Sequence, residues 1–326
     1  MPNIPLDEIE QTVRRALAAH GADAFAAAEV ARAVREAESI GNKICGLYYV
    51  ESYCQQLRSG RVIGKVTPKV STPRSGVVVV DAGFGFAQPA FAHGLPVALD
   101  AARRNGVASL AVSHAHTCTS LGYFTGQIAR AGMIAIGFTN ASPIVAAPGG
   151  KTRAIGTNPI AFSVPDGQGG LAMQFDQSTT TVALGKITMA KAAGERIPVG
   201  WALDAQGNPT TDPDAAIKGS LVSMGGYKGW GFGLMAEVLA AALTGSVLSR
   251  DVKPLKAPEG APHDLGQYYL LIDPTTALDF GDKIRALADH IAQDEGARMP
   301  GQNKATMDPV EVGEDTWQLI TTLAEG

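Results

Sequence analysis

Cysteine and aromatic residues are both scarce in this chain of 326 residues. It contains three cysteines, and 6% of its residues are aromatic. An odd, small number of cysteines in a chain of this length excludes a disulfide-stabilised scaffold and favours reduced thiols, as in a cytoplasmic protein. Cys45, Cys54 and Cys118 also lack the paired spacing of structural zinc sites. No metal centre is therefore predicted.

Excess positive charge and long apolar runs are absent as well. Lys and Arg total 27 against 31 Asp and Glu, which gives a formal net charge of -4. Binding to nucleic acid depends on clustered basic residues, so no nucleic-acid partner is expected. No stretch has the length and apolar character of a transmembrane helix, and the first residues, MPNIPLDEIEQ, do not resemble a secretory signal. We expect a cytoplasmic protein without a membrane partner.

Hydrophobic residues make up 45% of the chain, enough for one large core or for two to three smaller domains. From residue 77 onward, short apolar runs alternate with amphipathic stretches, which predicts an α/β fold. Residues 160–164 and 171–175 are joined by a turn of hairpin length, so the sheet is predicted to be mixed. The expected helices are residues 6–18, 24–38, 47–57, 89–104, 120–130, 228–243, 276–293 and 317–323, and the other strands are 77–80, 107–112, 133–138 and 268–272.

Two glycine-rich segments invite comparison with a dinucleotide-binding fingerprint. Residues 83–88 read GFGFAQ and lack the third glycine, and residues 229–233 read GWGFG inside a predicted helix. We interpret them as a tight turn and as a glycine-faced helix contact. A nicotinamide cofactor would therefore need a scaffold other than the Rossmann fold.

Two polar segments are candidates for binding a ligand. Residues 155–159 read IGTNP, in which Pro159 fixes its own φ and is expected to hold Asn158 in an extended conformation. Residues 176–180 read DQSTT and are predicted to follow a strand and to begin a helix, where amides and hydroxyls favour a phosphate or carboxylate group. A plain turn and a plain helix cap have the same composition, so the residues alone leave both interpretations open.

Five longer segments occur in a characteristic order: DAGFGFAQPA (81–90), ARAGMIAIGFTN (129–140), GGKTRAIGTNPIAFSVP (149–165), GWALDAQGNPTTDP (200–213) and MGGYKGWGFGLMAEVLAAALTG (224–245). Together they resemble the malate/L-lactate/ureidoglycolate dehydrogenase family of non-Rossmann NAD(P)-dependent oxidoreductases, which includes pyrroline- and piperideine-2-carboxylate reductases and sulfolactate dehydrogenase. The resemblance implies a mixed-sheet NAD(P)-binding core, a helical domain formed from both chain termini, and a homodimer acting on a small carboxylate. The expected domains are helical (1–60 plus 275–326), substrate or dimerisation (61–120 plus 215–274) and NAD(P)-binding (121–214).

The resemblance also implies which residues contact the cofactor. Gln302 stands where the family has an acid, and the loss of that charge beside Arg298 and Lys304 favours NADP(H) over NAD(H). The candidate cofactor-binding residues are His116, Thr117, Cys118, Thr119, Ser120, Thr157, Phe175, Asp176, Gln177, Ser178, Lys228, Gly229, Arg298, Pro300, Gly301, Gln302 and Lys304.

The largest departure from the family is GNKICG at residues 41–46. Relatives read GHDSHG, in which the serine and the second histidine relay and donate a proton, and a later arginine grips the substrate carboxylate. Here Ile44 takes the place of the serine, Cys45 that of the histidine and Tyr49 that of the arginine. Cys45 or His116 is left as a proton donor, and Tyr48 and Tyr49 offer further hydroxyls; alternatively, Cys45 merely packs. The candidate catalytic residues are Cys45, Tyr49, His116 and Asp176.

The missing histidine bears on the substrate. Hydride transfer to a ketone leaves an alkoxide, and a positioned acid that protonates it contributes about a hundred- to ten-thousandfold in rate. An iminium carbon arrives protonated and yields an amine directly. The sequence therefore favours reduction of a small 2-imino acid over reduction of a 2-oxo acid or oxidation of a 2-hydroxy acid. A catalytically silent relative that binds a nucleotide is the alternative of another class.

The remaining histidines carry less information. His114 and His116 are spaced as a pair on one strand, but no carboxylate or cysteine cluster accompanies them, so a metal site is not predicted. We interpret His20, His93, His263 and His290 as ordinary surface or capping residues.

Overall fold

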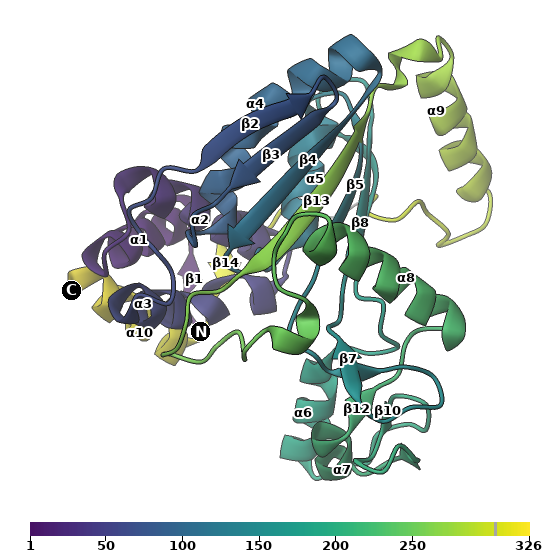
Figure 1. The fold of residues 1–326 in the computed structure, drawn as a ribbon. Coiled ribbons are helices and arrows are strands. Elements are labelled where there is room, and N and C mark those ends of the chain that lie inside the picture. The colour runs from purple at the N-terminus through teal and green to yellow at the C-terminus, as the bar shows by residue number, and fades with distance from the viewer. Residues whose placement is uncertain (303–304) are drawn as a thin grey trace.

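Both ends of the chain meet in a helical unit of the computed structural model, which describes residues 1–302 and 305–326 (Figure 1). Ile9, Val30 and Ile320 share one core there, so the predicted helical domain built from both termini is confirmed. The unit consists of β1 (Asn3–Ile4) paired with β14 (Val310–Glu311), α1 (Leu6–Ala19), α2 (Ala24–Ser39), the 3-10 turns η1 (Lys43–Cys45) and η2 (Leu47–Tyr49), α3 (Val50–Ser59) and α10 (Glu314–Glu325).

A seven-stranded mixed sheet forms the centre of the molecule. The strand order is β2-β3-β4-β13-β5-β8-β9, in which β3 and β4 are parallel and the other neighbours are antiparallel. The predicted mixed sheet and the β8–β9 hairpin are therefore confirmed. The strands are β2 (Lys69–Arg74), β3 (Val77–Asp81), β4 (Val107–Ala115), β5 (Ile134–Thr139), β8 (Ile160–Pro165), β9 (Leu171–Gln177) and β13 (Leu265–Ile272).

Alternate residues of the central strands face two different helical layers, as the period of two along a strand requires. Ala135 and Tyr269 lie in the core formed with α4 (Ala87–Asn105) and α5 (Leu121–Arg130). Phe138, three residues after Ala135, packs instead against Ala236 and Ala240. These belong to α8 (Tyr227–Glu237) and to its π-helical continuation η3 (Val238–Ala242). The central strands of the sheet are thus buried on both faces.

A smaller lobe lies below the large sheet in Figure 1. Val145, Ile187 and Leu221 share its core. The large sheet takes strands from the expected substrate or dimerisation domain (61–120 plus 215–274) and from the expected NAD(P)-binding domain (121–214). The proposed boundaries between the three domains therefore stay a prediction. The lobe contains β6 (Val145–Ala146), β7 (Arg153–Ile155), β10 (Ala202–Leu203), β11 (Pro209–Thr210) and β12 (Ser220–Leu221), in the order β11-β10-β12-β6-β7, with α6 (Leu184–Ala193) and α7 (Pro213–Lys218).

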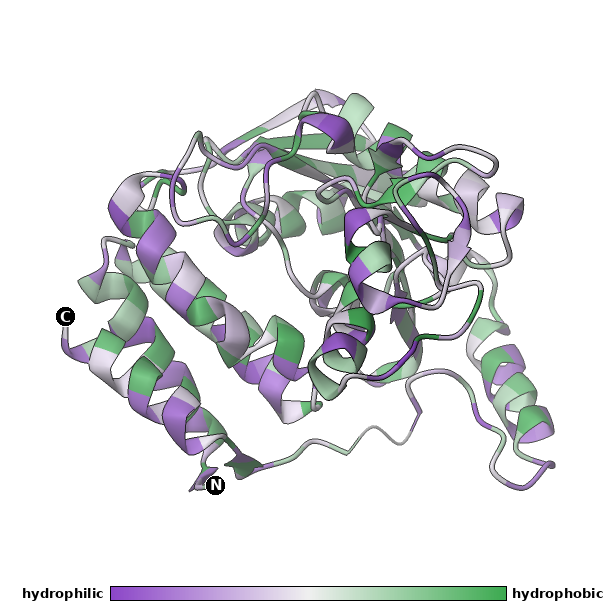
Figure 2. Ribbon diagram, turned by 90° about the horizontal axis from the view of Figure 1, so that it is seen from below, coloured by the Kyte–Doolittle hydropathy of each residue, from purple (hydrophilic) through white to green (hydrophobic). Residues whose placement is uncertain are grey.

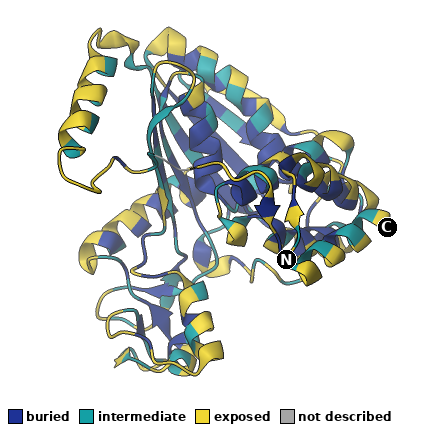
Figure 3. Cartoon of the chain, turned by 180° about the vertical axis from the view of Figure 1, so that it is seen from behind, coloured by how far each residue is buried: buried dark blue, intermediate teal, exposed yellow. Residues whose placement is uncertain are grey.

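α9 (Phe280–Ile291) stands away from the rest of the molecule. None of its residues is buried, as its exposed colouring in Figure 3 shows, and hydrophilic and hydrophobic residues alternate along it in Figure 2. The helix was predicted from residue 276, but residues 274–276 form the separate 3-10 turn η5 (Pro274–Thr276), because Asp273 caps the Thr275 backbone N–H at 2.9 Å. No helix in the described part of the chain combines the length and apolar character needed to cross a membrane.

Candidate active site

The two polar segments identified in the sequence lie side by side. β8 and β9 pair so that Ile160 faces Gln177. Just beyond this pair, the Thr179 backbone N–H and hydroxyl both donate to the Thr157 carbonyl oxygen, at 2.9 and 3.0 Å. Thr157 and Ser178 are half-buried. Both hydroxyls are therefore partly accessible at the same end of the hairpin.

Asn158 differs from its predicted extended conformation. Its φ is +35° although it precedes proline. Its fully buried amide donates to the Gly233 carbonyl oxygen at 3.0 Å and to a Glu237 carboxylate oxygen at 2.7 Å, and Ser249 donates its N–H and hydroxyl to the same carboxylate at 2.6 and 2.5 Å. Asparagine tolerates the left-handed region, so this buried network outweighs the preference imposed by Pro159.

Asp176 accepts a hydrogen bond from the first turn of α5, a helix that precedes it in the chain. It lies near the end of β9, and the next helix begins only at Leu184, so the predicted helix start at residues 176–180 is wrong. Instead, an Asp176 carboxylate oxygen accepts the Gly122 N–H at 2.8 Å in the first turn of α5, where the helix dipole favours negative charge. In the same strand, Phe175 packs its ring on that of Phe162, and Gln177 is exposed.

The loop before α3 places Cys45 near Asp176. Burial, with the Asp176 charge second, raises the pKa of the Cys45 thiol to about 12. Burial, with the neighbouring Cys45 second, raises the pKa of the Tyr49 hydroxyl to about 12. Both groups therefore hold their protons at neutral pH. Neither is matched to neutral pH as a general acid, since efficient proton transfer needs a pKa near the operating pH.

Thr117, Cys118, Thr119 and Ser120 connect β4 to α5. All but Thr119 are buried. Thr119 has a φ of +59°, which is unusual for a β-branched residue, and strained backbone of this kind is concentrated at functional sites. The Thr119 side chain lies beside the buried Tyr53 of α3 and opposes the rise that burial causes in the pKa of Tyr53. The connection is thus tied to the helical unit beside Cys45.

His116 points into the buried junction behind α3. Its ring packs against those of Tyr53, Phe86 and His263, and its Nε2 lies 2.6 Å from Gln56 Oε1. Burial, with His263 second, holds the pKa of His116 well below its ordinary value. A neutral imidazole engaged in this way does not carry the proton that an acid must supply, so we do not retain His116 as a proton donor.

His263 is not the isolated surface residue that we predicted. It is buried, its Nε2 accepts a hydrogen bond of 3.1 Å from Nε of the buried Arg61, and its ring lies 4.3 Å from that of His116. Arg61 and His263 are 202 residues apart, so the sequence holds no signal for their contact. Of the other histidines, His20 is buried, His93 and His290 are exposed, and His114 pairs with Asp81. The described residues contain no group of three His, Cys, Asp or Glu placed to hold a metal ion.

Two neighbouring cavities extend from Asp176 along the edge of the sheet. The first, of about 340 Å³, is lined by Ser120 and Asp176 on one side and by residues of α2 such as Glu36 on the other. The second, of about 490 Å³, shares Glu36 and Gln174 with the first and reaches Gly301. Together they form a groove between the helical unit and the edge strand β9. Predicted cofactor-binding residues from three separate segments line it.

The first turn of α8 carries Lys228 and Gly229. Lys228 is exposed, whereas Gly229 is packed so closely on Met224 that a Cβ would lie 2.1 Å from the Met224 carbonyl oxygen. The Met224 N–H donates to the Thr179 carbonyl oxygen at 3.0 Å. The segment that leads into α8 is therefore fixed to the segment beside Ser178.

Residues 298–302 run along β9. The Gln174 N–H donates to the Pro300 carbonyl oxygen at 2.8 Å, and a Cβ on Gly301 would lie 2.7 Å from the Gln174 carbonyl oxygen, so only glycine fits there. Gln302 uses its side-chain oxygen to accept a backbone N–H of the same turn at 3.0 Å. Arg298 is exposed, and Lys304 lies outside the described residues.

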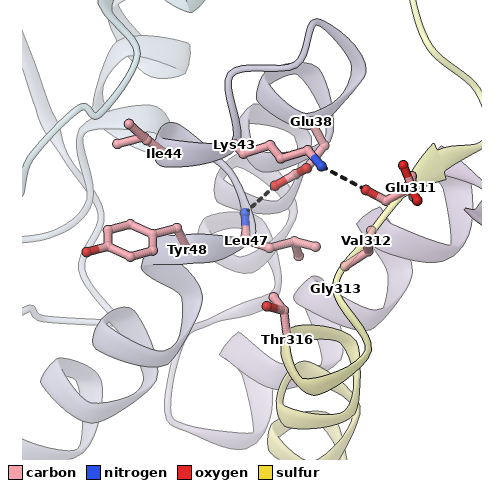
Figure 4. A pocket seen from close by; sticks show the side chains of 9 residues that line it. All are labelled: Glu38, Lys43, Ile44, Leu47, Tyr48, Glu311, Val312, Gly313 and Thr316. Atoms are coloured by element: carbon pink, nitrogen blue, oxygen red, sulfur yellow. Dashed lines mark hydrogen bonds between the residues drawn. The ribbon is translucent and has the colours of Figure 1, made fainter. Parts of the chain in front are cut away.

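A separate pocket of about 220 Å³ lies between the Cys45 loop, which is residues 40–49 between α2 and α3, and the start of α10 (Figure 4). Its polar groups are engaged with the backbone: Glu38 accepts the Leu47 N–H at 2.7 Å, and Lys43 donates to the Glu311 carbonyl oxygen at 3.0 Å. Burial raises the pKa of Glu38. These bonds anchor the loop that carries Cys45. The lining residues are Glu38, Lys43, Ile44, Leu47, Tyr48, Glu311, Val312, Gly313 and Thr316.

Sequence reasoning missed three residues of this region. Gly122 supplies the N–H that fixes Asp176, and Gln174 lines both cavities. Gln174 had a detectable signal, because it precedes Asp176 by two residues in one strand and so shares its face. Lys256 stands over the ring of Tyr48 from a remote loop, for which the sequence holds no signal.

Comparison with known proteins agrees with this fold. The family model for malate/L-lactate dehydrogenase matches residues 4–311. The chain is 40% identical to a (2R)-3-sulfolactate dehydrogenase (NADP(+)) from Chromohalobacter salexigens, over 92% of this chain and 90% of that protein. It is 34% identical to a Delta(1)-pyrroline-2-carboxylate/Delta(1)-piperideine-2-carboxylate reductase from Pseudomonas putida, over 92% and 89%.

A solved structure extends the likeness to three dimensions. The delta1-piperideine-2-carboxylate reductase from Pseudomonas syringae pvar. tomato superposes with a TM-score of 0.91 at 28% identity, over 99% of this chain and 100% of that one. The match of the family model and the two relatives above 30% identity agree with the resemblance that the sequence motifs carry. The chain belongs to the malate/L-lactate dehydrogenase family.

Proposed function

We propose that this oxidoreductase uses NAD(P)H to reduce C2 of a small cyclic or acyclic 2-imino acid of the pyrroline- or piperideine-2-carboxylate type. The observation that carries the proposal is the protonation state of the candidate proton donors. Cys45 and Tyr49 both have a pKa near 12, and His116 is neutral and buried. An iminium substrate needs no acid at C2, so this set of groups suits it better than a ketone.

The groove beside β9 supports a nicotinamide dinucleotide as the cofactor. Ser120, Asp176 and Gly301 line it, and the half-buried Thr157 and Ser178 hydroxyls stand at the end of the adjoining hairpin. The bound cofactor would supply the hydride. In the Asp176 region, the chain itself holds the carboxylate in place through the Gly122 N–H and keeps the Cys45 thiol protonated.

NADP(H) is the form that we favour. Gln302 is neutral, and Arg298 is exposed in the same segment, residues 298–302. Neither Arg298 nor Gln302 therefore carries a negative charge that would repel a 2'-phosphate. Lys228 adds an exposed cation at the start of α8. The 40% identical relative is also named as an NADP(+) enzyme.

A second candidate is reduction of a 2-oxo acid, or the reverse oxidation of a 2-hydroxy acid. It is favoured by the same relative, which is named a sulfolactate dehydrogenase. In that case Cys45 or Tyr49 must protonate the alkoxide, despite a pKa near 12.

A steady-state panel separates the two candidates. Purified protein is assayed with NADPH and with NADH against pyrroline-2-carboxylate, piperideine-2-carboxylate, pyruvate, oxaloacetate and 3-sulfopyruvate. The proposal expects the highest kcat/KM with a cyclic imine and NADPH, unchanged in Cys45→Ala. A higher kcat/KM with a 2-oxo acid, abolished in Cys45→Ala, supports the second candidate. Cofactor binding without turnover of any substrate supports a silent relative.

We also propose that the protein acts as a homodimer in the cytoplasm. The outer face of α8 and η3 exposes apolar side chains, which commonly marks an interface. The three cysteines are free, as a reducing compartment requires. Light scattering should give the dimer mass, and Val238→Asp should shift it towards the monomer. The exposed apolar residues are Phe232, Leu234, Met235, Val238 and Leu243.

A further inference from the structure

Lys256 presents an uncompensated positive charge beside the Cys45 loop. It lies between the 3-10 turn η4 (Ser249–Asp251) and β13, and its Nζ stands 3.6 Å from the ring centroid of Tyr48 and 5.5 Å from that of Tyr49. It also donates a hydrogen bond of 3.4 Å to the Tyr48 carbonyl oxygen. Within the described part of the chain, no carboxylate forms an ion pair with this exposed ammonium. The aromatic rings hold the cation without neutralising it.

A buried amide fixes the backbone on both sides of Lys256. Gln56 Nε2 donates to the Leu255 and Ala257 carbonyl oxygens, each at 2.8 Å. Because that amide nitrogen is engaged with two acceptors, Gln56 Oε1 is the acceptor for His116 Nε2 at 2.6 Å. The buried histidine thus orients Gln56, and Gln56 orients the residues that flank Lys256.

Arg61 and Ser59 hold the rest of the same segment. Arg61 donates to the Pro254 and Glu259 carbonyl oxygens at 3.0 and 2.9 Å, and Ser59 donates to the Pro258 carbonyl oxygen at 2.6 Å. Burying a guanidinium is costly unless its hydrogen bonds are satisfied. Two of the Arg61 bonds are directed at residues 254–259, a surface segment, which they hold in one conformation around its cation.

The loop against which Lys256 packs also approaches α6. In Figure 4 the side chains of Ile44 and Tyr48 both extend away from Glu311 and Thr316. The end of the Ile44 side chain lies 3.8 Å from where a Cβ on Gly185 of α6 would stand. Tyr49, the second aromatic ring near Lys256, is close enough to Cys45 for that thiol to contribute to the raised pKa of Tyr49. Lys256 therefore lies against the Tyr48 and Tyr49 rings of the loop that carries Cys45, and the same loop reaches α6 through Ile44.

We propose that Lys256 binds the carboxylate of the substrate. The inference rests on the proposed function and supplies the cation that is missing where Tyr49 replaces an arginine. A lysine ammonium is a single point charge, whereas an arginine binds a carboxylate through two parallel hydrogen bonds. The site therefore selects for negative charge without fixing the plane of the carboxylate, and Gln56 and Arg61 are positioning residues for it.

Kinetics of matched variants test the proposal. Lys256→Gln removes the charge, Lys256→Arg keeps it, and Lys253→Gln changes an exposed lysine three residues earlier. With NADPH and piperideine-2-carboxylate, Lys256→Gln should raise KM about tenfold or more, as expected for a lost charge-assisted hydrogen bond. Its kcat and its Kd for NADPH should stay within about threefold of the parent values. Lys256→Arg and Lys253→Gln should stay close to the parent in all three. A KM within twofold of the parent in Lys256→Gln overturns the proposal.

A double-mutant cycle tests the positioning role of Gln56. Gln56→Leu should raise KM as Lys256→Gln does, and the double variant should be no worse than Lys256→Gln alone, because both changes remove the same contact. Fully additive effects on KM would mean that Gln56 acts independently of Lys256, which would overturn its positioning role.

Binding of oxamate keeps this test independent of the proposed reaction. Oxamate is an unreactive carboxylate, and calorimetry with the NADPH-saturated protein measures its Kd even if no substrate of the panel is turned over. Binding by the parent that weakens about tenfold or more in Lys256→Gln supports the carboxylate site. Equal binding by both proteins, or no binding by the parent, overturns it.

Discussion

Replacing Asn158 by alanine removes the buried contacts that hold the turn beside the proposed nicotinamide site. The bond to the Gly233 carbonyl oxygen is worth about 1 kcal/mol, and the bond to the Glu237 carboxylate about 1.5–3 kcal/mol. Alanine also costs about 1 kcal/mol more than asparagine at a φ of +35°. The free energy of unfolding should therefore fall by about 3.5–5 kcal/mol. With an unfolding entropy of about 2.1 cal/mol/K per residue over 326 residues, Tm should fall by about 5–7 °C.

Urea unfolding followed by tryptophan fluorescence measures this loss. Asn158→Gly removes the same bonds but accepts the positive φ, so it should be about 1 kcal/mol less destabilised than Asn158→Ala. Asn208→Ala is the matched control, because Asn208 also precedes a proline but is exposed and makes only a 3.4 Å side-chain bond to Asp204. It should change stability by less than about 0.5 kcal/mol. A loss below about 1 kcal/mol in Asn158→Ala would refute the assignment of the turn to this network.

Three further predictions concern charge. Burial raises the pKa of Cys45 from 9.0 to about 12, so its thiolate fraction at pH 8 is about a thousandfold below that of an ordinary thiol. Mass spectrometry should therefore find correspondingly slow labelling of Cys45 by iodoacetamide, and labelling at the rate of a free thiol contradicts this. Burial raises the pKa of Glu38 above 4.5, so its contribution to stability is lost as pH rises through the folded value. Glu38→Gln should therefore gain on the parent in urea unfolding as pH rises above 4.5, whereas a constant difference argues against it. Gln302→Glu should raise the Kd for NADPH about tenfold and leave that for NADH nearly unchanged in fluorescence titrations; equal effects on both remove Gln302 from phosphate recognition.

Local patterns were sufficient to predict much of the fold. Apolar spacing placed α1 and α2 to within one residue, because each buries one helical face in the core that includes Ile9 and Val30. The turn at residues 165–170 predicted the β8–β9 hairpin, whose register brings the IGTNP and DQSTT segments together. The site was predictable to the extent that such segments adjoin in one hairpin.

Long-range contacts account for what could not be predicted. Asn158 adopts its left-handed conformation because of Glu237 and Ser249, which lie 79 and 91 residues further along the chain. His263 becomes part of a buried cluster through Arg61, 202 residues away. In both cases a distant hydrogen-bond partner overrides a preference that is local to the sequence.

The most direct test of the account is the structure of the complex with NADPH. We expect the nicotinamide ring between the Thr157 turn and Asp176, with C4 directed towards the Cys45 loop and Lys256 at the opening of the remaining space. A nicotinamide ring bound elsewhere, or an adenine in that position, would contradict the central claim.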